Sequence, residues 1–312
     1  MTDHAEPAHE GTDAGLSAVI SERRQLINLA YRLLGSLAEA EDAVQETYAR
    51  WYAMSREQQA AIASPGAWLT RVAGRICLDM LGSARARRER YVGEWIPEPL
   101  PDRTEWISGR PGVATSDPAD RVTLDESVSM AFLVVLEAMT PAERVSFVLH
   151  DVFGYPFAEV ARIVGRTPAA CRQLASSGRG RIRAAQASTA VPAARQARIV
   201  RNVKQALDAG DIDALIGLLD PGATAIGDGG GRATTVLHPI EGADEIARFL
   251  LRIQPVLRQQ TLLERTVNGR PGLVAQQDGV TVSVIAFEIA DDRITHIWSV
   301  RNPDKLRRWT TG

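Results

Sequence analysis

A long stretch with only one sign of charge constrains this chain more than any other feature. Between Val160 and Lys204 there are ten basic residues and no acidic residue. The stretch begins with two short helical patterns separated by Gly165. Thr167 and Pro168 then favour a new helix start, because threonine caps helices well and proline suits the first helical position. This spacing predicts a helix-turn-helix.

The outward face of the second helix carries side chains that suit DNA. Arginine and glutamine neutralise phosphates and hydrogen-bond to base edges in the major groove. The candidate contacts to duplex DNA are Arg166, Thr167, Arg172, Gln173, Ser176 and Arg179. The alternative is a helical hairpin with a solvated basic face. Gly178 and Gly180 each cost a helix about 1 kcal/mol, so we expect this helix to end near Ser176 or to become firm only on DNA.

Composition narrows the class of protein. The chain has 312 residues, enough for about two domains. Only Lys204 and Lys305 are lysines, so the clustering of arginine is informative and its abundance is not. Cys77 and Cys171 fall at apolar helical positions, which predicts a reducing compartment and no metal site or other cofactor. No signal peptide and no apolar run of about 18 residues is present, which predicts a cytoplasmic protein without membrane contact.

Three blocks and a linker follow from the pattern along the chain. Residues 16–91 show apolar side chains at helical spacing. Residues 92–122 contain five prolines and no sustained period, which predicts a flexible linker. Residues 123–187 hold capping boxes at Thr123–Glu126 and Thr140–Glu143 ahead of the helix-turn-helix, which predicts a module of about four helices.

The last block, residues 195–312, changes character along its length. It starts with helical patterns, and beyond residue 222 the alternation of apolar and polar residues predicts strands. Two of these strands, 280–289 and 293–300, flank a turn at Asp291 and Asp292, and a helix is expected at 241–253. The predicted fold class is therefore two all-α modules followed by an α+β domain with a mostly antiparallel sheet.

An acidic stripe and a basic tail mark the first module. Glu39, Asp42 and Glu46 recur at spacings of three and four beside Gln45, so they share one helix face. Such a stripe is commonly only a solvated face. The next helix, however, runs into a cluster of arginines near Tyr91 and Trp95, and arginines with aromatic rings suit single-stranded DNA. The arginines are Arg85, Arg87, Arg88 and Arg90. Together these features predict a protein that bridges DNA to another protein.

These motifs resemble those of bacterial RNA polymerase sigma factors of the extracytoplasmic-function (ECF) group. The segment 40–47 resembles the helix that docks on the clamp of the largest polymerase subunit. The resemblance implies polymerase contacts by Glu39, Glu41, Asp42, Gln45 and Glu46. The segment 68–91 resembles the part that melts the minus-ten element, which implies DNA contacts by Arg75, Arg85, Arg87, Arg88 and Arg90. Residues 123–183 resemble the module that recognises the minus-thirty-five element. Arg75 departs from the asparagine common in the family.

Three further segments resemble marks of one subgroup of this family. Its members carry a fused SnoaL-like cone with a curved sheet, which is implied to regulate sigma activity through contacts with the sigma core and linker. The implied regulatory residues are Trp95, Pro97, Asp228, Gly229, Gly230, Gly231, Asn302, Pro303, Asp304, Lys305 and Leu306. The alternatives are a plain surface loop at the glycines and a capped helical tail at 302–306.

The last domain also has an enzymatic interpretation, which we weigh as the weaker one. Cones of this type have an open cavity, in which Asp228, His238 and His296 would form an acid–base set. Ile294, His296, Trp298 and Val300 share one face of the strand 293–300, so a role for His296 in the wall is simpler. Asp228 before three glycines suits a turn. We therefore expect no enzyme. The competing function is a helix-turn-helix regulator with a ligand-binding or cyclase-like domain that binds DNA without polymerase.

Overall fold

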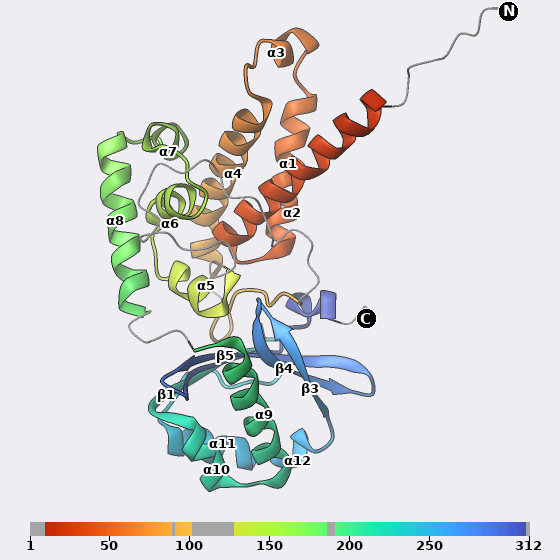
Figure 1. Cartoon of the computed structure of the whole chain (residues 1–312), viewed down its shortest axis with the longest axis vertical. Helices are drawn as coiled ribbons and strands as arrows, with labels where there is room; N and C mark the ends of the chain where they lie inside the picture. Colours follow the sequence, from red (N-terminus) through yellow and green to blue (C-terminus); the bar gives the residue numbers. More distant parts are fainter. Residues whose placement is uncertain (1–9, 89–90, 102–127, 186–190, 310–312) are drawn as a thin grey trace, which may run out of the picture.

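The structure is a computed structural model with helices on one side and a sheet domain on the other (Figure 1). It describes residues 10–88, 91–101, 128–185 and 191–309, with side chains in the first range from residue 22 to residue 83. Within these ranges no helix is long and apolar enough to cross a membrane. The described part also contains no group of three or more His, Cys, Asp or Glu side chains suited to a metal ion.

The first module consists of four helices joined by short turns. They are α1 (Glu10–Leu34), α2 (Leu37–Tyr52), α3 (Arg56–Ala60) and α4 (Pro65–Arg88). The helix starts follow from local chemistry, because Ser36 accepts a hydrogen bond from the backbone N–H of Glu39 and caps α2. Ser55 and Gln58 form a capping box at the start of α3.

The second module carries the helix-turn-helix. Its elements are α5 (Met130–Glu137), α6 (Pro141–Phe147), the π-helical turn η3 (Val148–Val152), α7 (Phe157–Val164) and α8 (Pro168–Ala185). The capping box of Thr140 and Glu143 is present as expected. Ser129 caps α5, and the box expected at 123–126 lies outside the described residues. Gly165 ends α7 with a φ of 71°, a left-handed conformation that glycine adopts at low cost.

The expectation that the second helix of this motif ends near Ser176 is wrong. Helix α8 continues through both glycines to Ala185. Gly178 lies against α6, where an added Cβ would come within 2.9 Å of the Cβ of Phe147. The low helical propensity of glycine is thus compensated by close packing of α8 on α6.

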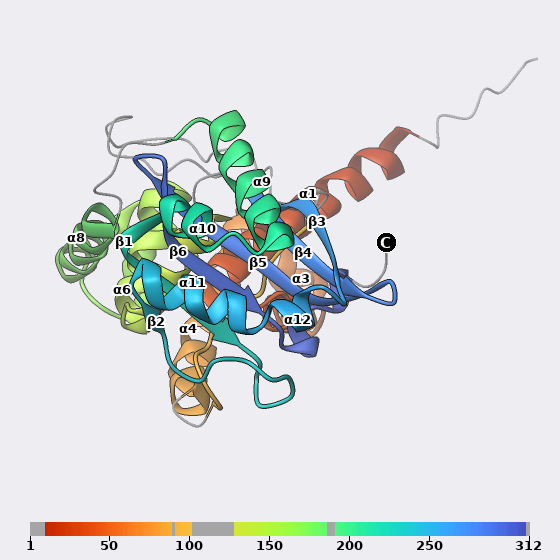
Figure 2. The same cartoon turned by 90° about the horizontal axis from the view of Figure 1, so that it is seen from below.

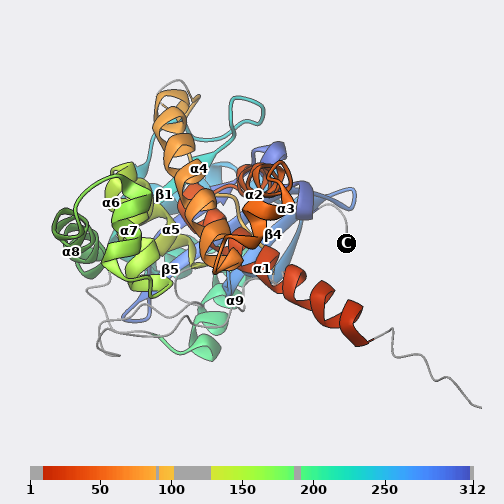
Figure 3. The same ribbon diagram turned by 90° about the horizontal axis from the view of Figure 1, so that it is seen from above.

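The two helical modules are not separated in this structure, because their apolar side chains share one core. The guanidinium of Arg144 in α6 is buried and donates to the backbone carbonyl of Leu33 in α1 at 2.9 Å. The hydroxyl of Tyr155 donates to Thr70 in α4 at 3.0 Å. Helix α4 therefore packs directly on the helix-turn-helix, as the view from above also shows (Figure 3).

The last domain combines four helices with one sheet. The helices are α9 (Ala193–Ala209), α10 (Ile212–Leu218), α11 (Ala243–Arg252) and α12 (Gln254–Leu257). The strands are β1 (Leu219–Asp228), β2 (Ile240–Glu241), β3 (Thr261–Val267), β4 (Arg270–Gln277), β5 (Val280–Ala290) and β6 (Arg293–Val300). The described residues form a six-stranded sheet in the order β2-β1-β6-β5-β4-β3. Only the β1–β6 pair among these neighbours is parallel.

The turn between β5 and β6 lies where the sequence predicts it. Asp291 and Asp292 both have positive φ, 47° and 64°, as a tight hairpin turn requires. The register between β5 and β6 shifts near Glu288, so the β6 residues before and after the shift do not alternate regularly between the two faces of the sheet. Ile294 therefore joins the same core as Ile297, whereas Trp298 and Val300 lie on the opposite face.

The two faces of the sheet have different neighbours. Helices α9 to α12 cover one face and form the core of the last domain with it (Figure 2). The other face packs against Ile96, Met130 of α5 and Leu306 of the C-terminal segment. That segment follows β6 as the 3-10 turns η4 (Pro303–Lys305) and η5 (Arg307–Trp309). The sheet thus forms a wall between its own helices and the helical modules.

Candidate functional site

The acidic stripe lies on the outer face of α2. Asp42, Gln45 and Glu46 are exposed, and Glu39 and Glu41 are partly exposed. The opposite face is buried through Ala40, Ala43, Val44 and Thr47. Glu46 forms an ion pair with Arg50 at 2.8 Å, one turn along the helix. The carboxylate of Glu41 instead pairs with Arg308, so the C-terminal segment reaches the edge of the stripe.

The residues expected to hold the minus-ten element are only partly described. Arg75 of α4 donates from Nη1 to the backbone carbonyl of Ile163 in α7 at 3.1 Å. Beside it, Gly74 faces Ile163 so closely that an added Cβ would meet the Ile163 side chain at 3.1 Å. The side chains of Arg85, Arg87 and Arg88, and the whole of Arg90, lie outside the described residues. In this arrangement Arg75 contacts the helix-turn-helix through one hydrogen bond, while its side chain stays 51% exposed.

The residues expected to hold the minus-thirty-five element lie in the turn before α8 and along α8 itself. Those exposed to solvent are Arg166, Thr167, Arg172, Gln173 and Ser176. The Thr167 hydroxyl accepts from the backbone N–H of Ala170 at 3.2 Å, so Thr167 caps the helix as predicted. The guanidinium of Arg172 lies over the ring of Phe157 at 5.3 Å. Arg179 is half-buried against Asp151 at 3.4 Å and is less available to DNA than the others.

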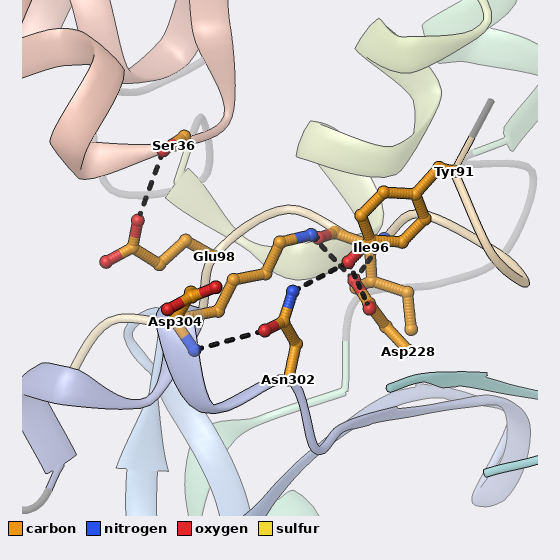
Figure 4. A network of polar contacts seen from close by, with 8 residues as sticks. Ser36, Tyr91, Ile96, Glu98, Asp228, Asn302 and Asp304 are labelled. Carbon is orange, nitrogen blue, oxygen red and sulfur yellow. Dashed lines mark hydrogen bonds and ion pairs between the residues drawn. The ribbon is translucent and has the colours of Figure 1, made fainter. Parts of the chain in front are cut away.

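Asp228 lies at the centre of a polar joint between the last domain and the linker (Figure 4). Its fully buried carboxylate accepts from the Tyr91 hydroxyl at 2.6 Å and from the backbone N–H of Ile96 at 3.0 Å. The Nζ of Lys305 also donates to this carboxylate, 2.6 Å from Oδ2 of Asp228. Burial and the neighbouring Asp228 carboxylate both raise the pKa of Tyr91, so its hydroxyl stays a donor. Asp228 is thus a buried acceptor and not a simple turn residue.

Lys305 connects the C-terminal segment to the same linker. Besides Asp228, its ammonium donates to the backbone carbonyl of Ile96. It also lies 3.9 Å from the ring centroid of Trp95 and 5.3 Å from that of Tyr91, within the range of cation–π attraction. A buried ammonium is stable only with such partners. The joint therefore supplies a carboxylate, a carbonyl and two rings.

The glycine loop and the start of the C-terminal segment meet at this joint. Gly230 has a φ of 59°, and an added Cβ would approach the side-chain nitrogen of Asn302 to 2.3 Å. That nitrogen donates to the Tyr91 hydroxyl at 2.8 Å, and the Asn302 side-chain oxygen accepts from the backbone N–H of Asp304 (Figure 4). Asp304 pairs with Arg307 and Arg232, which hold the pKa of its carboxyl below the usual value. The glycines therefore form a packed loop.

Of the linker expected at 92–122, residues 96–100 are packed and not free, and residues 102–122 lie outside the described residues. Ile96 and Leu100 are buried, and so are Pro97 and Glu98. The Glu98 carboxylate accepts from the backbone N–H of Leu37 at 2.7 Å. The Glu98 backbone N–H donates to the carbonyl of Gly35 at 2.8 Å. Burial raises the pKa of Glu98 despite these hydrogen bonds. The segment is held against the first module on one side and the last domain on the other.

Asn268 is an interdomain residue that the sequence did not reveal. It lies in the β3–β4 turn with a φ of 50° and is 1% exposed. Its amide nitrogen donates to the Tyr31 hydroxyl and to the Val128 carbonyl, both at 2.9 Å. Its amide oxygen accepts from the backbone N–H of Leu100 at 2.9 Å. Asn268 followed by Gly269 signals a turn, but nothing local signals contacts to both helical modules.

The residues of the enzymatic interpretation do not come together. His238 is exposed, and Asp228 is engaged in the joint. His296 stacks on Trp298 with ring centroids 5.4 Å apart, and Trp298 packs on the face toward the helical modules. None of the three lines the cavity between the sheet and helices α9, α11 and α12. An acid–base set in that cavity is therefore wrong.

Comparisons with known proteins agree with this geometry. Residues 19–87 match the family model "Sigma-70 region 2", and residues 129–182 match "Sigma-70, region 4". The chain is 38% identical over 296 residues to the ECF RNA polymerase sigma factor SigJ of Mycobacterium tuberculosis (strain ATCC 25618 / H37Rv), covering 91% of this chain and 90% of SigJ. The chain belongs to the ECF RNA polymerase sigma factors.

Two further matches cover nearly the whole of this chain. The chain is 35% identical over 288 residues to the probable ECF sigma factor SigI of Mycobacterium tuberculosis (strain CDC 1551 / Oshkosh), covering 92% of each protein. The crystal structure of Mycobacterium tuberculosis SigJ matches with a TM-score of 0.70 at 34% identity, covering 93% of this chain and 98% of that one. The match includes the helical modules and the α+β domain.

Family membership decides between the two functions that the sequence left open. ECF sigma factors are transcription initiation factors and not enzymes, and the family binds RNA polymerase and promoter DNA. Region 2 contains α2 and α4, and region 4 contains the helix-turn-helix of α7 and α8. A regulator that acts without polymerase is thereby set aside.

Proposed function

We propose that this sigma factor docks on the polymerase clamp through the stripe of α2 and that its last domain restrains promoter recognition by holding regions 2 and 4 together. Docking through α2 is supported by the exposure of Asp42, Gln45 and Glu46 above a fully packed apolar face. Exposed ion pairs contribute only about 0.2–1 kcal/mol each. The apolar and aromatic contacts around the stripe must therefore supply most of the affinity.

Promoter contacts are assigned by module. The exposed side chains of α8, with Arg172 and Gln173 at their centre, would enter the major groove of the minus-thirty-five element. Arg75 and the arginines at 85–90 would hold the opened minus-ten strand. A bidentate contact to a base discriminates by about 1–3 kcal/mol. Two modules that read two separated elements must be able to move to the spacing of the promoter.

One observation carries the proposed restraint. The segment 94–101 is fastened on both sides, by Leu37 through Glu98 and by Asp228 and Lys305 at Ile96. While it is fastened, this segment cannot extend between the two DNA modules. Arg75 is meanwhile bonded to Ile163 in region 4. These contacts support a closed form of the free chain, in which Arg75, the proposed minus-ten residue, would contact region 4 and not DNA.

Opening of the closed form requires an exchange of partners. Polymerase binding at α2 would compete with the pair between Glu41 and Arg308 at the edge of the stripe. That exposed pair alone is too weak to hold the closed form. The buried contacts at Asp228 and Asn268 would supply the restraint, and polymerase and promoter contacts would replace it. With core polymerase as its partner, the protein would work in the cytoplasm.

Charge reversal tests the docking assignment. Asp42→Arg combined with Glu46→Arg should weaken binding of full-length protein to core polymerase by about tenfold or more, since two attractive contacts become repulsive. Glu57→Arg is the matched control, because Glu57 is an equally exposed acidic residue on α3, outside the stripe. Fluorescence anisotropy measures the affinity. Unchanged affinity of the double variant, with its fold intact by circular dichroism, would refute docking through α2.

A further inference from the structure

The last domain contains a cavity that no step of transcription initiation requires. Its volume is about 520 Å³, and it lies between the sheet and helices α9, α11 and α12. Pockets for small molecules commonly have about 300–1,000 Å³. The walls are mainly aliphatic and aromatic, with Leu207, Ile246, Phe249, Leu250 and Phe287 among them. A ligand that fills this space must have a mainly apolar body.

A few polar groups interrupt these walls. Ser283 and Ser299 share a hydrogen bond at 3.0 Å between neighbouring strands. Arg301 and Thr234 also line the cavity, and Thr234 is exposed to solvent while Arg301 is half-buried. These two residues therefore mark an opening of the cavity. A ligand would place its polar end there and its apolar body deeper inside.

Arg301 is the charged group of this opening. Its guanidinium donates to the backbone carbonyl of Thr234. Across the described part of the chain it forms no ion pair with a carboxylate, and its partial burial lowers its pKa. A guanidinium has five donors in a planar fork that matches a carboxylate, and such pairs are stronger than hydrogen bonds to a neutral group. The opening thus offers hydrogen-bond donors and a positive charge to an anion.

We propose that this cavity binds a small apolar carboxylic acid, with the carboxylate on Arg301 and the hydrocarbon tail among the side chains of α11 and the sheet. A cationic ligand would be repelled by Arg301. A nucleotide or sugar would leave its polar groups unpaired against the apolar wall. A neutral hydrocarbon would fill the cavity but would leave the guanidinium without an anion.

Residues that line the cavity are direct chain neighbours of residues that form the joint. Gly227 lines the cavity and its neighbour Asp228 holds Lys305. Arg301 likewise lines the cavity, and its neighbour Asn302 bonds to Tyr91. A bound acid would therefore contact residues next to those at the ends of β1 and β6 that bond to the linker. The site itself goes beyond the proposed function, because ligand binding to the free chain does not depend on polymerase.

Binding of decanoate and of decan-1-ol to the full-length protein tests the proposal. Isothermal titration calorimetry should show saturable binding of one decanoate per chain, with decan-1-ol about tenfold weaker, because only the acid pairs with Arg301. Arg301→Gln should lower the affinity for decanoate by about tenfold and leave the affinity for decan-1-ol unchanged. Arg248→Gln is the matched control, since Arg248 lies on α11 but pairs outward with Glu245. It should leave both ligands unchanged.

A cavity-filling variant locates the site. Ala225 lies on β1 in the cavity wall and is partly exposed. Ala225→Leu should remove binding of both ligands while the melting temperature stays near that of the wild type. If the variant does not fold, the Arg301→Gln titrations decide alone. Absence of saturable decanoate binding, equal affinities for acid and alcohol, or decanoate binding unchanged by Arg301→Gln would each overturn the proposal.

Discussion

The Nζ of Lys305 lies 2.6 Å from the carboxylate of Asp228, and the Lys305 ammonium also bonds to the backbone of Ile96 in the linker. The ion pair therefore joins the end of β1, the C-terminal segment and the linker at one point. Because the Asp228 side chain is 0% exposed and that of Lys305 is 9% exposed, the pair is shielded from salt.

Removal of the cation tests this connection. Lys305→Met leaves the Asp228 carboxylate buried without its counter-ion, which should lower the free energy of unfolding by about 3 kcal/mol or more. Urea denaturation of the full-length protein measures the change. Asp228→Asn in the same background removes the unpaired charge and should recover part of the loss. A double variant less stable than Lys305→Met would contradict the pairing.

Asn268 is expected to contribute to stability through its three side-chain hydrogen bonds. Asn268→Ala should lower the free energy of unfolding by about 2–4 kcal/mol, because it leaves buried partners without a donor or acceptor. Asp278→Ala is the matched control, since Asp278 has a similar φ of 51° before a glycine and is exposed. Calorimetry should find the control within about 1 kcal/mol of wild type. Equal losses would mean that only turn conformation matters.

The two glycines of α8 should respond oppositely to alanine. Gly180→Ala should stabilise the chain by about 0.5–1 kcal/mol, because an added Cβ meets open space and alanine favours the helix. Gly178→Ala should destabilise it by about 1–3 kcal/mol through the contact with the Phe147 Cβ at 2.9 Å. Thermal melts of both variants measure the difference. A gain at both positions would show that α6 and α8 are less closely packed.

The stability of the joint should depend on pH through Glu98. Burial raises its pKa in the folded chain above the unfolded value of about 4.3. Just above that value the folded chain retains a proton that the unfolded chain has lost, so the stability contributed by Glu98 falls as pH rises. Glu98→Gln cannot ionise. From pH 4 to 7 the wild type should lose stability relative to this variant, and parallel curves would contradict the raised pKa.

Local patterns predicted much of this structure. The helix-turn-helix, the caps at Thr140 and Thr167, and the Asp291–Asp292 turn each depend on neighbours in sequence, so the sequence alone could locate them. The acidic stripe followed in the same way from helical spacing, and its residues are exposed or partly exposed. Its polymerase contacts stay a prediction.

The contacts that close the chain could not be predicted in this way. The position of Asp228 before glycines indicated a turn. Its partners Tyr91 and Lys305 are far away in sequence, so the local pattern could not reveal them. Proline-rich composition indicated a free linker, although prolines leave the carbonyls and apolar side chains of an extended segment available for packing. Gly178 lowered the helical propensity of α8, yet only the tertiary contact with Phe147 explains why glycine stands there. Ile294 was assigned to the face of His296, Trp298 and Val300, but the register shift near Glu288 places it on the opposite face.

The central claim is that the last domain holds regions 2 and 4 in a closed form that opens on polymerase. The most direct test is the distance between dyes at Glu57→Cys in α3 and Ala184→Cys in α8, both exposed positions, measured by single-molecule energy transfer. The native cysteines, Cys77 and Cys171, are buried and should label poorly. We expect a short distance in the free protein, a longer one with core polymerase and promoter, and a shift toward the longer one in free Asn268→Ala. The same distance in all three samples would contradict it.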